Sequence, residues 1–238
     1  ASDVYKRQER KEFKYLGARH EFGHLSNTEQ FRELPMMGGE TTPVVGGVKT
    51  MLYDVKDLLI QCVDLYCEVA GVSRSSLRRV GTPFIEESLL PDGQESSNVV
   101  EGKLGPKASQ ILMKSLYAAR VGRFDLLRPI SSLASCTTKW AVWCDRMLLK
   151  VVAYANSTLD HFLIGYVGDS PDKWTLGVYT DADLAGCRLS KRSTSGVLIV
   201  NEAQHTYFPL LGVSKKQTAV SHSSTAVSYT HLTLPTTP

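Results

Sequence analysis

The chain has 238 residues, with 42% hydrophobic and 21% charged residues and a formal net charge of +3. These values are ordinary for a globular protein and leave room for one large domain or two small ones. A net charge this small gives no argument for nucleic-acid binding on its own.

Cysteine usage and the length of the apolar runs argue against a disulfide-rich protein and against a membrane-spanning one. The five cysteines are an odd number without C-x-x-C spacing, which favours free thiols in a reducing compartment over a disulfide framework. No apolar run reaches the ~20 residues that span a bilayer, and the first residues lack the apolar segment of a signal peptide. We therefore expect an intracellular protein without a membrane partner.

Both ends differ in composition from the rest of the chain. No Asp, Glu, Lys or Arg follows Lys216, and ten of the last 22 residues are Ser or Thr, which would also fit a polar disordered tail. The peptides "SDVYKRQ" (2–8) and "VSYTHLTLPT" (227–236) resemble translated sequencing-adapter DNA. We therefore expect 1–8 and 227–238 to be adapter-like scars that take no part in the fold.

The first half predicts a strand, a loop and a helix. Residues 11–22 fit a strand, and the Gly- and Pro-rich segment 35–49 is typical of a loop. Residues 48–72 carry apolar side chains at three- and four-residue steps, which predicts one amphipathic helix that stops at Gly71. The segment 81–106 is rich in turn residues and predicts a linker or long loop.

The second half predicts an α+β fold, in which a helical region precedes an antiparallel meander. Pro129 should kink the second helix of this region or lie near its start. The predicted elements are, in order, helices over 107–121, 123–136 and 139–160, a turn-rich connector over 165–173, and strands over 174–183, 195–202 and 205–216.

The motif "HEFGH" (20–24) matches H-E-x-x-H, which on a helix directs two histidines at one zinc ion. Gln30 stands where the metzincin pattern has a third histidine, and Gly17 and Gly23 disfavour a helix. The alternative interpretation is a pair of surface histidines, His20 and His24, on a strand or turn. A zinc hydrolase stays an alternative function at this point.

Asp181 and Asp183 end the predicted strand 174–183. Alternate residues of a strand share a face, so the two carboxylates should point the same way, together with Tyr179. Two carboxylates on one face can begin a Mg²⁺ site. The alternative interpretation is a solvated strand end.

The stretch "YTDADLAGCRLSKRSTSGVLIV", followed by "SKKQTAVSHSST", resembles the start of the ribonuclease H domain of copia-type retrotransposon polyproteins. The matching segments are Tyr179 to Asp183, Lys191 to Gly196, Ser214 to Gln217 and Ser223 to Thr225. Looser similarity upstream, in "KYLGARHEF", "VGTPF" and "LMKSLYAARVGRFDLLRPISSLAS", resembles the end of the reverse transcriptase of the same family.

The resemblance implies that the parent protein hydrolyses RNA in RNA/DNA hybrids with Mg²⁺, for which Mn²⁺ can substitute. Asp181 matches the first catalytic and metal-binding carboxylate, and Asp183 matches a possible auxiliary position. Ala226 and Ser228 stand where the family has glutamates, so this chain is expected to be inactive. The expected contacts to the hybrid are Lys191, Arg192, Ser193, Thr194, Ser195, Lys215 and Lys216, although lysines at a strand edge can also act against aggregation.

The resemblance also implies a division of the chain. Residues 9–105 would be the C-terminal part of reverse transcriptase, with the palm end and a thumb-like region. Residues 106–170 would be a helical connection, and 171–226 the first three antiparallel strands of a truncated ribonuclease H-like mixed sheet. The expected partners are an RNA/DNA hybrid and the rest of the Pol polyprotein, and the resemblance implies a cytoplasmic particle or the nucleus as the location. The second alternative function is a non-catalytic nucleic-acid-binding remnant of a decayed element.

Overall fold

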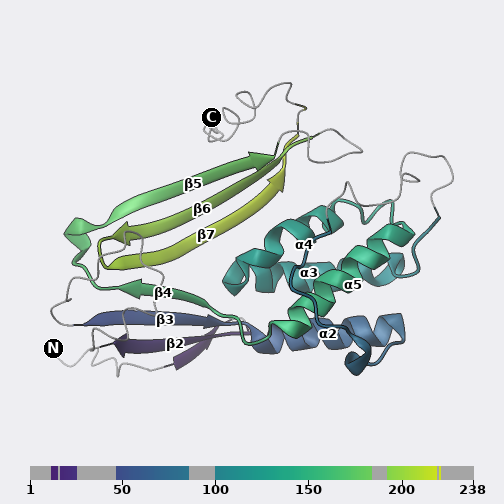
Figure 1. Cartoon of the computed structure of the whole chain (residues 1–238), viewed down its shortest axis with the longest axis horizontal. Coiled ribbons are helices and arrows are strands. Elements are labelled where there is room, and N and C mark those ends of the chain that lie inside the picture. Colours follow the sequence, from purple (N-terminus) through teal and green to yellow (C-terminus); the bar gives the residue numbers. More distant parts are fainter. Residues whose placement is uncertain are drawn as a thin grey trace, which may run out of the picture.

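The computed structural model describes residues 12–15, 17–25, 47–85, 100–183, 192–218 and 220. Within these ranges the chain forms a seven-stranded sheet and four α-helices, so the predicted α+β class is confirmed. Figure 1 shows the helices gathered at one end of the sheet, beside strand β7. The proposed scars at 1–8 and 227–238, like Lys191, lie outside the described residues.

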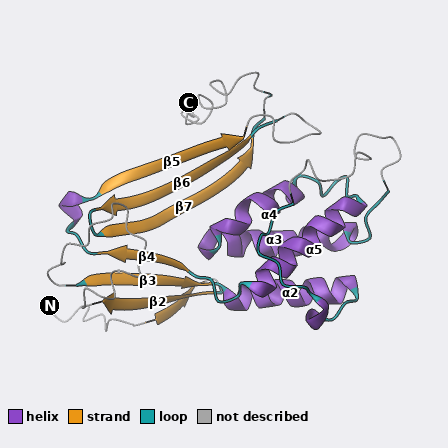
Figure 2. Ribbon diagram, in the orientation of Figure 1, coloured by secondary structure: helices purple, strands orange, loops and turns teal. Residues whose placement is uncertain are grey.

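Every hydrogen-bonded pair of neighbouring strands in the sheet is antiparallel, in the spatial order β1-β2-β3-β4-β7-β6-β5. The long strand β5 therefore forms one edge of the sheet and the short β1 the other (Figure 2). The strands are β1 (Glu12–Tyr15), β2 (Ala18–Leu25), β3 (Val48–Asp54), β4 (Leu163–Val167), β5 (Thr175–Asp183), β6 (Thr194–Ala203) and β7 (Thr206–Lys216).

The helices pack together around the main hydrophobic core, which holds fully buried side chains such as Ile111, Leu133 and Leu148. Gly71 ends the first helix in the left-handed conformation with φ 66°, as its sequence position predicted. Pro129 lies in the first turn of α4, where its missing N–H breaks no helical hydrogen bond. The helices are α2 (Lys56–Ala70), α3 (Gly105–Gly122), α4 (Leu127–Ala134) and α5 (Val142–Ser157).

Two N-terminal predictions are wrong in part. The predicted single strand over 11–22 is a hairpin of β1 and β2 that turns at Gly17. The predicted helix over 48–72 begins only at Lys56, because Val48–Asp54 is strand β3 and pairs with β2 on one side and β4 on the other. The apolar residues of Val48–Asp54 fit both the helix and the strand periodicity. Pairing with a strand on each side decides that this segment is a strand.

The predicted connector over 165–173 contains a strand that the sequence did not reveal. Leu163–Val167 forms β4, which pairs with β3 and, through Tyr166 and Val167, with β7. The three strands predicted at the C-terminal end are confirmed as β5, β6 and β7, but they join four other strands in one sheet. Three strands, β1 to β3, precede the helices, where the sequence predicted a single strand over 11–22.

Candidate functional site

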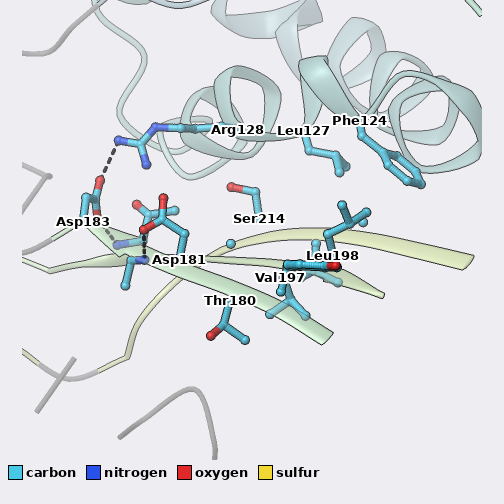
Figure 3. Close-up of a pocket in the computed structure, with 15 residues that line it drawn as sticks. Phe124, Leu127, Arg128, Thr180, Asp181, Asp183, Val197, Leu198 and Ser214 are labelled. Carbon is cyan, nitrogen blue, oxygen red and sulfur yellow. Dashed lines mark hydrogen bonds and ion pairs between the residues drawn. The ribbon is translucent and has the colours of Figure 1, made fainter. Parts of the chain in front are cut away.

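A cavity of about 490 Å³ lies between α4 and the strands β5, β6 and β7. Figure 3 shows Arg128, Leu127 and Phe124 above it and the strands below it. Its strand side is lined by residues 179–183 of β5, by Thr194 and Gly196–Leu198 of β6, and by Gly212–Ser214 of β7.

Strand register brings the predicted acidic residues into two neighbouring rows across the sheet. Asp181 pairs with Gly196, which pairs with Ser214. Asp183 pairs with Thr194, which pairs with Lys216. In Figure 3, Asp181, Asp183 and Ser214 point toward the helix and Thr180 points away. The prediction that Asp181 and Asp183 share a face is confirmed.

Asp183 is held in an ion pair. Its Oδ2 accepts a hydrogen bond from Arg128 Nη2 at 2.6 Å, and its Oδ1 accepts one from the backbone N–H of Thr194. The Arg128 guanidinium also lies over the ring of Phe84, 5.0 Å from its centroid. Asp183 therefore fastens α4 to the ends of β5 and β6.

The surroundings of Asp181 differ from those of Asp183. Its side chain is exposed, and its Oδ1 accepts the backbone N–H of the next residue, Ala182, at 2.8 Å. It forms no ion pair with any other residue that the structure describes. Beside it, Gly196 leaves open space, since an added Cβ there would have only the Asp181 carbonyl oxygen as a neighbour, at 3.6 Å. Asp181 is the cavity carboxylate available to a cation.

The acidic residues suit one hydrated Mg²⁺ better than a two-metal centre. In its protein sites Mg²⁺ keeps several waters and binds through one or two carboxylates plus phosphate oxygens. Asp181 can provide one of these carboxylates. Two-metal cleavage needs more carboxylates around ions about 3.5–4 Å apart. Among the residues that the structure describes, no group of three or more His, Cys, Asp or Glu side chains could hold a metal ion.

The residues predicted to contact nucleic acid differ in the face of the sheet on which they lie and in their burial. Thr194 and Lys216 lie in the row of Asp183, whereas Ser195 and Lys215 pair one position away and face the other side of the sheet. Arg192 is exposed. Ser193 is fully buried, and its carbonyl oxygen accepts the N–H of Gln217 at 2.8 Å. Ser193 therefore closes the end of the sheet and is not accessible to a ligand.

Arg128 is the cavity residue that sequence reasoning missed. It lies 55 residues before Asp183, and only the packing of α4 on the strands brings the two together. The resemblance covered its helix without assigning it a role. A cation followed by Pro129 in a short helix gave no local signal of a site.

The "HEFGH" motif lies on strand β2, which does not give the geometry of a zinc site. Residues four apart on a strand are separated by roughly 13 Å, too far for one ion to bind both histidines. His20 is also buried, which corrects the prediction of two surface histidines. Its ring stacks on Phe13 with centroids 4.5 Å apart, and its Nδ1 has no hydrogen-bond partner among the residues that the structure describes.

Comparison with family models, with curated proteins and with solved structures gives no match. The family resemblance therefore rests on the sequence motifs alone. No helix in the described ranges is long and apolar enough to cross a bilayer.

Proposed function

We propose that this chain belongs to the Pol polyprotein of a copia-type retrotransposon. In this proposal it contains the end of the reverse transcriptase, a helical connection and the beginning of a ribonuclease H domain. The cavity then binds an RNA/DNA hybrid, with Asp181 as the ligand of a Mg²⁺ ion. The sequence motifs carry the family part of the proposal. The observation that carries the metal site is the exposed Asp181 carboxylate, which lies beside an open cavity floor without an ion-pair partner in the described chain.

The chemistry of the cavity supports nucleic acid as the ligand. A Mg²⁺ ion at Asp181 would complete its coordination with water and phosphate oxygens. Arg192 and Lys216 lie near the same end of the strands, where cations can attract a phosphate backbone, whereas Lys215 could do so only on the opposite face of the sheet. Arg192 is exposed two residues before β6, and Lys216 lines the hollow beside Arg128.

Under this proposal the chain binds a hybrid without cutting it. Asp181 and Asp183 come from one strand, and Asp183 is engaged by Arg128. In-line displacement requires further carboxylates to fix the metal ions. We propose that the remaining part of the polyprotein provides these carboxylates, and that the complete protein acts inside the cell.

Metal binding is the direct test. Mn²⁺, used as a paramagnetic substitute for Mg²⁺, should broaden the NMR signals of residues around Asp181, and Asp181→Asn should abolish the broadening because the amide has lost the negative charge. Asp64→Asn is the matched control, since Asp64 is an exposed carboxylate on α2. Broadening that persists in Asp181→Asn would contradict the assignment.

Hybrid binding is the second part of the test. Fluorescence anisotropy with a labelled RNA/DNA hybrid should show affinity that rises with Mg²⁺ in the parent protein and not in Asp181→Asn, with no cleavage product in either. Hybrid affinity that changes neither with Mg²⁺ nor in Asp181→Asn would favour the non-catalytic remnant instead. The absence of any hybrid binding would refute the proposed function.

A further inference from the structure

The Arg128–Asp183 ion pair leaves much of the guanidinium unused. A guanidinium has five N–H donors, and one of them, on Nη2, binds Asp183 at 2.6 Å. The Arg128 side chain is 42% exposed, whereas that of Asp183 is 25% exposed. Figure 3 shows the guanidinium reaching over the carboxylates from α4. Arg128 can therefore accept a second anion, or exchange Asp183 for one.

A hollow directly beside Arg128 contains further groups that suit an anion. It is lined by Lys216 and by hydroxyl side chains from α4, β6 and β7, and Phe84 closes one side. Lys216 also lies in the Asp183 row of the sheet. The hydroxyl residues of this hollow are Ser131, Ser132, Thr194 and Ser214.

We propose that Arg128 and Lys216 form a phosphate subsite, in which Arg128 exchanges Asp183 for an oxygen of a nucleic-acid phosphodiester. The subsite deepens the proposed function, because the hybrid provides the phosphate. Asp183 has the role of a placeholder, which holds the guanidinium over the cavity until nucleic acid arrives.

The physical chemistry of the two anions favours this exchange. A phosphodiester offers two charged oxygens to the planar fork of an arginine, and it brings Lys216 into the same contact. Phe84 remains under the guanidinium during the exchange, so Arg128 keeps its position when Asp183 is released. The exchange also assigns Asp183 a function opposite to metal binding, since its charge competes with the ligand.

A double-mutant cycle tests the exchange. Affinity for the hybrid is measured in EDTA, so that metal binding at Asp181 does not contribute. Arg128→Gln should weaken binding about tenfold, as expected for a lost charge-assisted hydrogen bond, and should lower the salt slope by about one. Asp183→Asn should strengthen binding, because it releases Arg128. In the Arg128→Gln background, Asp183→Asn should have much less effect.

Matched variants separate this exchange from simple electrostatics. Asp181→Asn removes the same charge from the same face and should strengthen binding less than Asp183→Asn does. Arg146→Gln, on α5, should leave affinity nearly unchanged. Arg128→Lys, which keeps the charge without the fork, should retain part of the binding. Circular dichroism and thermal unfolding identify any variant that fails to fold, and the Asp183→Asn gain can be read in a folded protein whatever Arg128→Gln does.

Inorganic phosphate provides a probe that is independent of the hybrid. Phosphate should shift the NMR signals of Thr194 and Ser214 in the parent protein and not in Arg128→Gln. If the protein binds phosphate in this way but no hybrid, the proposed function fails and the subsite stands. Equal gains from Asp181→Asn and Asp183→Asn, or a phosphate response unaffected by Arg128→Gln, would overturn the subsite.

Discussion

The helical region and the three strands β5 to β7 differ sharply in how much apolar surface they bury. The helices enclose a core in which Ile111, Ile130 and Leu133 are completely buried. On β5, by contrast, Leu176 is 62% and Val178 is 55% exposed. Burial of apolar surface is the main stabilising term in folding, so the helices contribute most of the stability and the strands depend on their attachments.

Contacts at both ends hold the strands to the rest of the molecule. At the end where Arg128 binds Asp183, α4 packs on β7, and Gly212 lets Phe124, just before α4, approach so closely that an added Cβ would lie 2.8 Å from its ring. At the other end, β7 pairs with β4. There Asp169 accepts hydrogen bonds from the backbone N–H of His205 at 2.6 Å and from Thr206 Oγ1 at 3.0 Å.

The largest expected effect contrasts one core residue with one strand residue. Leu133→Ala removes a fully buried side chain and leaves a cavity, so it should lower the free energy of unfolding by about 2–5 kcal/mol. Val178→Ala, at an exposed position of β5, should change it by less than about 0.5 kcal/mol. Urea denaturation measures both. Similar losses in the two variants would show that β5 is covered by apolar contacts.

An intermediate effect is expected at the attachment of β7 to β4. Asp169→Ala leaves the N–H of His205 and the hydroxyl of Thr206 without this acceptor, and should cost about 1–3 kcal/mol. Amide hydrogen exchange should then accelerate in β5 to β7 more than in α3 and α5. Uniform acceleration throughout the chain would contradict a local role for this attachment.

The same carboxylate makes a signed prediction for pH. Burial by itself would raise the pKa of Asp169, but the hydrogen bonds from His205 and Thr206 outweigh it and lower the pKa below the ordinary 3.8. A group with a lowered folded pKa stabilises the fold above its unfolded pKa, and this stability is lost as pH falls through the folded value. The difference in unfolding free energy between parent and Asp169→Ala should therefore shrink below about pH 4.

The smallest effect is expected within the stable helical region itself. Lys56 and Asp160 form an ion pair at 2.5 Å, but their side chains are 39% and 79% exposed. Asp160→Asn should therefore change stability by about 0.5 kcal/mol or less, and even less at high salt. A larger loss would mean that location in the helical region, rather than burial, sets the cost of a substitution.

Local patterns in the sequence determined much of the architecture. The predicted helices over 107–121 and 139–160 correspond to α3 and α5, the three predicted C-terminal strands correspond to β5 to β7, and Gly71 marked the end of α2. The alternation of strand side chains also predicted that Asp181 and Asp183 share a face. These features depend on residues close in sequence, which is why they could be predicted without knowledge of the fold.

Only the tertiary structure decided the features that depend on distant partners. Val48–Asp54 is a strand because β2 and β4 flank it, and the short β4 became visible only between β3 and β7. The packing of α4 on the strands set Arg128 against Asp183, an ion pair that no local pattern in the sequence indicated. The position of a residue in the strand or helix repeat determines the direction of its side chain. Its charge partner depends on which element packs opposite, and the packing of elements is determined by residues throughout the chain.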